Sequence, residues 1–290
     1  MAKGALLASN TSQIPISSLA EGVTKPEAFI GMHFSSPVEK MPMVEVIKGR
    51  ETSEETLKRA VDTVRLIGKT PIVVNDGRGF YLTRLFNSLV FEALEMVAEG
   101  VPAPSIEQAS AQGGFATQPL LVLDQISLNL ARQIVADERH AAESEGREYE
   151  ERPSHRVIAR MVEDFDRPGR AAGAGFYDYV DGRRVGFWPG LADAFGKDGE
   201  RTDIAGLIER MRFRVAAEVL RARAEGIVES DTLADVGSVM AGFPATTGGA
   251  LTFVRTYPGG EEAFYARARE LAAEHGSRFA PADTTPVDPS

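Results

Sequence analysis

Two neighbouring segments, Gly31-Met32-His33-Phe34-Ser35-Ser36-Pro37 and Met43-Val44-Glu45-Val46-Ile47, decide the fold of the first part of the chain. Each contains a short apolar run of the kind that forms a buried strand. If the two strands are neighbours, His33 and Glu45 meet at one edge of the sheet. Histidine is the side chain best suited to move a proton at neutral pH, and a carboxylate against its other nitrogen would orient it. The segments therefore predict a sheet that carries an acid–base pair.

A further strand is predicted at Ala5-Leu6-Leu7-Ala8, and Ser9-Asn10-Thr11-Ser12 follows it. Ser12 could supply a hydroxyl that holds a substrate oxygen, so the three groups suit removal of a proton from an alcohol as hydride leaves its carbon. Structural alternatives stay open, because a lone histidine in an apolar run is often a satisfied core residue and Ser9–Ser12 can form a polar turn. Glu45 needs solvent or a partner among its apolar neighbours.

The composition is that of a soluble globular protein of one to three domains, with 290 residues, 43% of them hydrophobic and 26% charged. The absence of cysteine excludes disulfides, thiolate catalysis and cysteine-bound zinc. The four histidines lack the spacing of a metal site, so we expect no metal. The net charge of -10 argues against nucleic acid as a partner but allows a phosphorylated small ligand. No signal peptide or membrane span is apparent, and we expect a cytoplasmic protein.

Residues 1–76 have the rhythm of an α/β unit. Thr52 and Glu55 form a capping-box pattern at the start of a helix that Gly68 ends. A fourth strand is predicted at Pro71–Val74. From residue 77 the pattern becomes helical, with helices expected at 80–99, from Ser105 (capped with Gln108) to 113, at 127–142 and at 156–165.

The last part of the chain repeats the middle. The segment from Arg84 to Gly100-Val101 resembles the segment from Arg210 to Gly226-Ile227, and each leads to a Gly-Phe pair. One supersecondary unit used twice is the simplest explanation. We therefore expect helical domains at 77–180 and 201–280, a polar connector at 181–200, and a disordered tail at 281–290.

In their order and spacing, four segments resemble the 3-hydroxyacyl-CoA dehydrogenase family, specifically the fused form in the α-subunit of the bacterial fatty-acid β-oxidation complex. They are Ala8–Ser12, Gly31–Pro37, Val44–Ile47 and Asp76–Phe80, within a resemblance that runs from about Ala5 to about Thr256. The resemblance implies a Rossmann sheet followed by two similar helical domains. It also implies oxidation of a (3S)-hydroxyacyl-CoA to the 3-ketoacyl-CoA with NAD as cofactor.

The resemblance also assigns roles to residues. His33 would take the hydroxyl proton, Glu45 would orient it, and Ser12 would contact substrate and nicotinamide. Ser36 stands where the family usually has a cofactor-binding asparagine, and Thr83 stands where an asparagine usually lies near the substrate thioester. A cofactor-binding lysine of relatives is replaced by Ala171, with Arg170 beside it.

A larger departure is that the chain contains no strand–GxGxxG–helix unit; Gly173-Ala174-Gly175 comes closest. Family members begin their dinucleotide domain with this unit, and the complex subunit carries an enoyl-CoA hydratase domain before it. We therefore expect a partial Rossmann sheet holding only the C-terminal strands, without the phosphate-binding loop. On this interpretation the isolated chain is weakly active or inactive unless another polypeptide supplies the GxGxxG half.

Two other interpretations remain open. The chain could be a non-catalytic subunit that forms a homodimer or docks a thiolase through its helical domains, or a truncated gene product without an independent role. The dehydrogenase interpretation implies an acyl-CoA substrate. The sequence does not fix its acyl-chain length.

Overall fold

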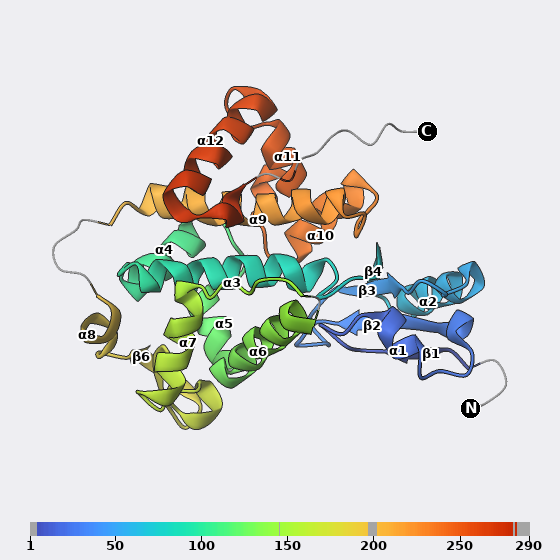
Figure 1. Cartoon of the computed structure of the whole chain (residues 1–290), viewed down its shortest axis with the longest axis horizontal. Helices are drawn as coiled ribbons and strands as arrows, with labels where there is room; N and C mark the ends of the chain where they lie inside the picture. The colour runs from blue at the N-terminus through green and yellow to red at the C-terminus, as the bar shows by residue number, and fades with distance from the viewer. Residues whose placement is uncertain (1–4, 145, 197–201, 281, 283–290) are drawn as a thin grey trace. The chain divides into compact units, whose positions relative to one another are not determined.

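A computed structural model describes residues 5–144, 146–196, 202–280 and 282 (Figure 1). These residues form two compact units: one contains the chain up to Phe86 together with the chain from Val215, and the other contains Asn87–Arg214. No helix in the described ranges is long and apolar enough to cross a membrane. The predicted tail falls outside the described residues, except for Ala282.

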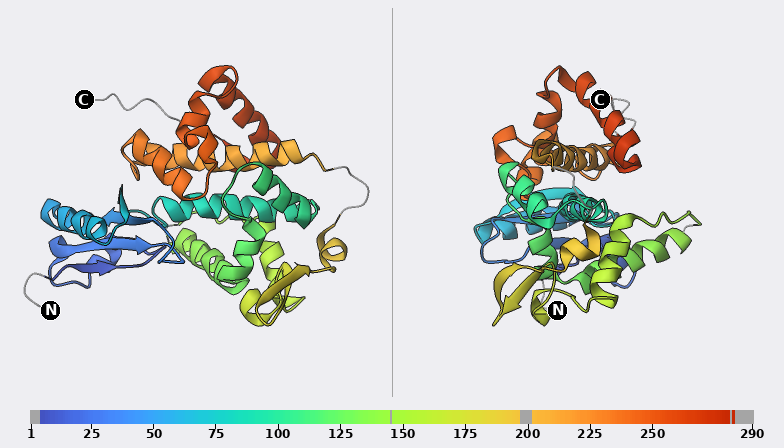
Figure 2. Two further views of the ribbon diagram at one scale, coloured as in Figure 1. Left: turned by 180° about the vertical axis from the view of Figure 1, so that it is seen from behind. Right: turned by 90° about the vertical axis from the view of Figure 1, so that its left-hand side faces the viewer.

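The first unit contains a four-stranded mixed sheet in the order β1-β2-β3-β4 (Figure 1). Its strands are β1 (Leu7–Ser9), β2 (Phe29–Phe34), β3 (Met43–Lys48) and β4 (Thr70–Asn75). β1 runs parallel to β2, β2 antiparallel to β3, and β3 parallel to β4. The reverse view shows the strands side by side (Figure 2). The four strands predicted from sequence are thus confirmed, with ends that differ by a few residues.

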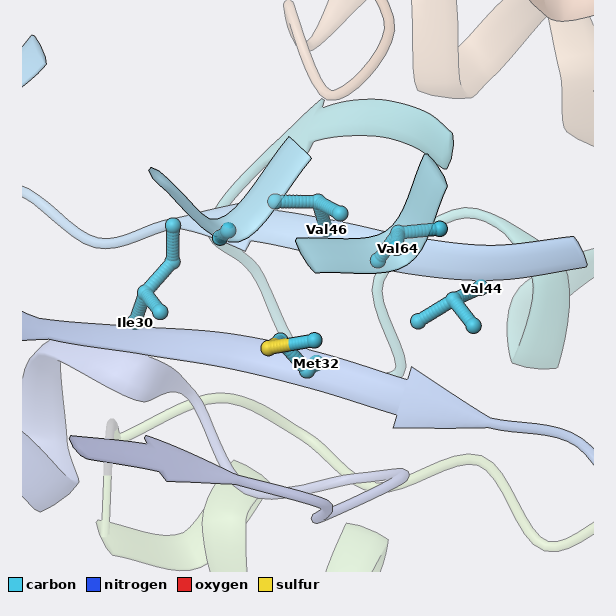
Figure 3. Packing of buried hydrophobic residues seen from close by; sticks show 6 residues of the cluster. Ile30, Met32, Val44, Val46 and Val64 are labelled. Atoms are coloured by element: carbon cyan, nitrogen blue, oxygen red, sulfur yellow. The ribbon is translucent and has the colours of Figure 1, made fainter. Parts of the chain in front are cut away.

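Alternation along β2 and β3 gives the sheet two different faces. Figure 3 shows Ile30 and Met32 from β2 and Val44 and Val46 from β3 gathered with Val64 of α2 (Glu54–Leu66). This buried cluster fills the face that α2 covers. The intervening residues point to the opposite face, where Ile16 of α1 (Ile16–Ala20) lies against Gly31 of β2. The short helix η1 (Pro26–Ala28) leads into β2, and its Glu27 carbonyl accepts a hydrogen bond from the Thr56 hydroxyl of α2.

The cap of α2 corrects the capping box expected at Thr52 and Glu55. The N-cap is Ser53, whose Oγ accepts a hydrogen bond from the Thr56 amide at 3.2 Å. The Thr52 hydroxyl instead donates to the Phe29 carbonyl at 2.7 Å and accepts from the Gly49 amide at 3.0 Å. Thr52 therefore fastens the loop before the helix to β2. Gly68 closes the helix as expected, with φ of 75°.

The second unit is mainly helical. It contains α4 (Ala103–Gln112), α5 (Pro119–Ile126), α6 (Leu128–Ser144), α7 (Pro153–Glu163), η2 (Arg170–Ala172), β5 (Tyr177–Val180), β6 (Arg183–Phe187) and α8 (Leu191–Phe195). The helix start expected at Ser105 is wrong, because α4 begins at Ala103 with Pro102 as its N-cap. The segment expected to be a polar connector contains β6, which pairs with β5 in an antiparallel hairpin, and α8.

The long helices α3 (Leu82–Ala98) and α9 (Ile204–Ala224) contribute residues to both units. The first unit also contains α10 (Asp231–Met240), η3 (Ala245–Thr247), α11 (Ala250–Arg255), α12 (Gly260–His275) and η4 (Ser277–Phe279). The helix expected at 80–99 is confirmed as α3, which begins two residues later and ends one residue earlier than expected.

Ion pairs recur at matching positions of the two similar sequence segments. In the first unit, Arg84 pairs with Glu218 and Glu225. In the second unit, Arg210 pairs with Glu92 and Glu99. Glu92 and Glu99 follow Arg84 along the chain at the same intervals at which Glu218 and Glu225 follow Arg210.

Helix caps recur in the same way. Glu107 on α4 accepts a hydrogen bond from the Leu121 amide in the first turn of α5. Asp235 on α10 accepts from the Leu251 and Thr252 amides in the first turn of α11. In both places a carboxylate on one short helix holds the start of the next one.

Candidate active site

The register of β2 and β3 places His33 directly opposite Glu45. His33 Nδ1 lies 3.0 Å from Glu45 Oε2, so the two side chains share a hydrogen bond. The Glu45 side chain is fully buried, whereas 11% of the His33 side chain is exposed. The structure thus confirms that the two side chains meet, as expected from the sequence. They do not lie at an edge of the sheet, because β2 and β3 are its inner strands.

The second oxygen of Glu45 is held by the start of α3. Glu45 Oε1 accepts hydrogen bonds from the Tyr81 amide at 2.8 Å and the Leu82 amide at 3.1 Å. Amides at a helix N-terminus have no partner inside the helix and carry a partial positive charge that favours a carboxylate. With His33 on the other oxygen, both carboxylate oxygens have protein partners, which fixes the carboxylate in one orientation.

A left-handed turn delivers these two amides. Gly79 has φ of 72° and Phe80 has φ of 48°. Glycine adopts this conformation freely, but it is uncommon and strained for an aromatic residue. Phe80 is fully buried, and its ring centroid lies 6.2 Å from that of His33. The strained residue therefore also forms part of the wall around the imidazole.

Ser12 belongs to the loop that follows β1. The Asn10 side chain accepts a hydrogen bond from the Phe34 amide at 2.8 Å, which ties the loop to the end of β2. Ser12 lies in an exposed bend three residues beyond β1 (Leu7–Ser9), in the polar segment expected to follow the strand. Its hydroxyl makes no hydrogen bond to any residue that the structure describes.

The other residues that the resemblance assigned do not join the pair directly. Ser36 is exposed in the turn after β2, and Thr83 is half-buried in the first turn of α3. Within the described ranges, no hydrogen bond links either of them to His33 or Glu45. Arg170, in the second unit, donates to the Gly182 carbonyl, and Ala171 is exposed beside it in η2.

The geometry suits a general base. When His33 is neutral, the proton it donates to Glu45 sits on Nδ1, which leaves the lone pair on Nε2. Among the described residues Nε2 has no hydrogen-bond partner, so it can accept a proton from a ligand. The buried carboxylate then stabilises the imidazolium that forms.

The two residues expected to bind the cofactor follow neighbouring strands of the sheet. Ser12 and Ser36 follow β1 and β2, which are parallel, and ligands in open α/β sheets bind beyond the carboxyl ends of such strands. A pyrophosphate needs a glycine-rich turn from a strand into a helix. In the described residues Gly173-Ala174-Gly175 lies between η2 and β5, which does not form such a turn. Ser12 and Ser36 are therefore candidate residues for contact with the nicotinamide end of such a ligand.

Residues 1–77 match the family model "3-hydroxyacyl-CoA dehydrogenase, NAD binding domain", and residues 79–179 match "3-hydroxyacyl-CoA dehydrogenase, C-terminal domain". The chain belongs to the 3-hydroxyacyl-CoA dehydrogenase family. It is 33% identical over 283 residues to the fatty acid oxidation complex subunit alpha of Shewanella sp. (strain MR-7), and 34% identical to that of Shewanella sp. (strain ANA-3). The match covers 95% of this chain but 39% of each Shewanella protein.

Three solved structures have a similar fold. The 3-hydroxybutyryl-CoA dehydrogenase of Escherichia coli K12 matches with a TM-score of 0.72 at 20% identity, over 96% of this chain and 74% of that one. The dehydrogenase part of a multifunctional enzyme from C. elegans matches with a TM-score of 0.64 at 18% identity, over 95% and 63%. The (S)-3-hydroxybutyryl-CoA dehydrogenase of Ralstonia eutropha is 30% identical over 61% of each chain, with a TM-score of 0.53.

Sequence reasoning missed the groups that hold Glu45. Backbone amides leave no mark in residue type, so Tyr81 and Leu82 gave no signal as hydrogen-bond donors. The segment Gly77-Arg78-Gly79-Phe80 was one available sign, since glycines before an apolar helix indicate a turn with unusual backbone angles.

Proposed function

We propose that this chain provides the proton-transfer machinery of a 3-hydroxyacyl-CoA dehydrogenase, which oxidises a (3S)-hydroxyacyl-CoA to the 3-ketoacyl-CoA with NAD. The observation that carries the proposal is the buried Glu45 carboxylate, which bonds His33 Nδ1 through one oxygen and two helix amides through the other. Such a carboxylate can orient a histidine base. The proposed reaction is also the one for which the family of the chain is named.

In the proposed reaction His33 Nε2 accepts the proton of the substrate 3-hydroxyl as the C3–H bond breaks with its electron pair. NAD, when bound, supplies the acceptor for that hydride. The C3–O bond becomes a carbonyl, and the positive charge on His33 is balanced by Glu45 across 3.0 Å. His33 then releases its proton to solvent, since 11% of its side chain is exposed.

Three further residues are proposed to bind ligands. Ser12 contacts the substrate oxygen and the nicotinamide, since its hydroxyl is exposed beyond β1. Ser36 contacts the cofactor, and Thr83 lies near the thioester of the acyl-CoA. Both have a shorter side chain than the asparagine usual in the family, so a water or a closer ligand would complete each contact.

We further propose that a second polypeptide supplies the site for the pyrophosphate of NAD. The support is that the sequence contains no strand–GxGxxG–helix unit. The sheet then corresponds to the C-terminal strands of a Rossmann domain, within residues 1–76. Alone, the chain should bind NAD weakly and turn over slowly.

The recurring ion pairs of Arg84 and Arg210 and the recurring caps of Glu107 and Asp235 support two copies of one helical domain, at 77–180 and 201–280. The relatives are subunits of a complex, so a partner subunit is part of the proposal. A homodimer or a docked thiolase would fit it. If the chain serves only to dock such a partner, substitution of His33 or Glu45 will leave its function unchanged.

The test uses a chimera in which the part of the Shewanella sp. (strain MR-7) protein that precedes its matched region is joined to this chain. The chimera should reduce NAD with (3S)-hydroxyacyl-CoA and ignore the (3R) isomer, whereas the chain alone should show little activity. No oxidation by a folded chimera that binds NAD would refute the proposed function. Full activity of the chain alone, lost on His33→Ala, would refute the proposal that another polypeptide must supply the site for the pyrophosphate of NAD.

A further inference from the structure

Tyr81 connects the buried carboxylate of Glu45 to helix α10. Its amide donates to Glu45 Oε1 at 2.8 Å, and its side chain runs to α10, where the hydroxyl donates to the Ala234 carbonyl at 2.7 Å. The side chain is fully buried. One residue therefore touches the acid–base pair with its backbone and a helix more than 150 positions later in sequence with its side chain.

The ring of Tyr81 lies against Gly237 on α10. A Cβ atom at position 237 would lie 2.8 Å from Tyr81 Cε1 and 3.1 Å from Cδ1, closer than side chains approach. Glycine inside a helix costs about 1 kcal/mol relative to alanine, so its presence here calls for a packing reason. The approach of the ring supplies that reason.

The hydroxyl of Tyr81 stays protonated and available as a donor. Burial raises its pKa well above the ordinary value, and the nearby Asp235 and Glu45 carboxylates add to the effect, while Arg223 opposes it. The hydroxyl therefore remains a hydrogen-bond donor to the Ala234 carbonyl at neutral pH.

The helix that receives Tyr81 is itself tied to the sheet. The Asn75 amide, at the end of β4, donates to the Ile227 carbonyl at 2.8 Å. The Asn75 side chain donates to the Gly226 carbonyl and to Glu229, both at 2.8 Å. The segment that leads into α10 is thus fixed to the strand next to the one that carries Glu45.

We propose that Tyr81 and Gly237 are positioning residues: α10 holds the Tyr81 ring, and the ring aims the amides of residues 81 and 82 at Glu45. The catalytic meaning of this arrangement rests on the proposed function, but the arrangement itself can be tested without turnover. The second helical segment of the chain thereby sets the geometry of a proton-transfer pair in the sheet.

The direct test is NMR of the full chain labelled with ¹⁵N-histidine, with the His33 resonances assigned by a His33→Gln variant. In the wild type we expect a protonated Nδ1 whose hydrogen exchanges slowly, as a bond to a buried carboxylate requires. Gly237→Ala should displace the ring and speed the exchange of this hydrogen. Tyr81→Phe keeps the ring and loses only the hydrogen bond to Ala234. It should also speed the exchange of the His33 hydrogen, but by less than Gly237→Ala.

Val236→Ala is the matched control, because Val236 neighbours Gly237 on α10 and is 37% exposed. It should leave the His33 resonances unchanged. If Gly237→Ala lowers the melting temperature but leaves the His33 hydrogen as in the wild type, the proposal is overturned. If Gly237→Ala does not fold, Tyr81→Phe decides, and an unchanged His33 signal in that variant overturns the proposal.

Activity of the chimera separates this inference from the proposed function. Gly237→Ala should lower kcat by about tenfold to a hundredfold with little change in KM, since small displacements of reacting groups have effects of this size. An inactive wild-type chimera would defeat the proposed function and leave the NMR comparison standing. Unchanged kcat in a Gly237→Ala chimera would defeat the positioning role alone.

Discussion

His33 Nδ1 and Glu45 Oε2 lie 3.0 Å apart across two antiparallel strands, with the carboxylate fully buried and 11% of the histidine side chain exposed. A slip of β2 against β3 by one residue would send the two side chains to opposite faces of the sheet. The pairing therefore depends on the apolar residues on the α2 side, which fix the register.

Replacing Glu45 with glutamine tests the orientation of the imidazole. The oxygen of the new side-chain amide can still accept from the Tyr81 and Leu82 amides, so its NH₂ group faces His33 Nδ1. The histidine proton then moves to Nε2, which can no longer accept the substrate proton. We expect Glu45→Gln to lower kcat by about 10²- to 10⁴-fold in the chimera. Histidine ¹⁵N shifts should show the tautomer change in the chain itself; an unchanged tautomer would contradict it.

Glu107 should make the second unit less stable as the pH rises. Its burial raises the pKa from 4.5 to about 7, although the Leu121 amide and the Tyr177 hydroxyl oppose the shift. A carboxyl with a raised pKa in the folded state contributes stability that is present below pH 4.5 and lost as the pH rises through about 7. Glu107→Gln should remove this loss, which amounts to up to about 3 kcal/mol. Urea unfolding at pH 5 and pH 8 measures it, and equal pH dependence in both proteins would refute it.

His155 should make the second unit less stable as the pH falls. Burial lowers its pKa from 6.5 to about 4, helped by Arg152. The Arg152 amide donates to its Nδ1 at 3.2 Å, which keeps that nitrogen unprotonated. Because the unfolded chain takes up the proton first, stability should fall as the pH drops from 6.5 towards 4. The imidazole C–H resonances of His155 should titrate near pH 4, and a midpoint above pH 6 would contradict the buried geometry.

Gly175 should tolerate no side chain. A Cβ there would lie 2.0 Å from Asp124 Oδ1, and that carboxylate already accepts from the Phe176 and Tyr177 amides at 2.8 and 2.9 Å. Gly175→Ala should destabilise the chain by at least about 2 kcal/mol, because the buried carboxylate would lose partners. Gly186→Ala is the matched control, since its Cβ would meet open space. Equal melting temperatures of the two variants would contradict this account.

The sequence supported the strands, the long helix and the pairing of His33 with Glu45, because apolar periodicity and spacing carry these features. It did not indicate how Glu45 is held, since the donors are backbone amides brought in by a strained turn at Phe80. The hairpin at residues 177–187 was missed although Asp181-Gly182 marks its turn, with φ of 50° and 70°. Helix α5 was missed because its eight residues are too short and too uniformly apolar to show a helical period.

The central claim is that His33 is the base of a 3-hydroxyacyl-CoA dehydrogenase site. The most direct measurement is the rate of NAD reduction with (3S)-hydroxyacyl-CoA by the chimera carrying His33→Ala, compared with His140→Ala, which changes an exposed histidine on α6. We predict a loss of about 10²-fold or more for His33→Ala and no change for His140→Ala. Equal rates in the two variants would show that His33 does not take the substrate proton.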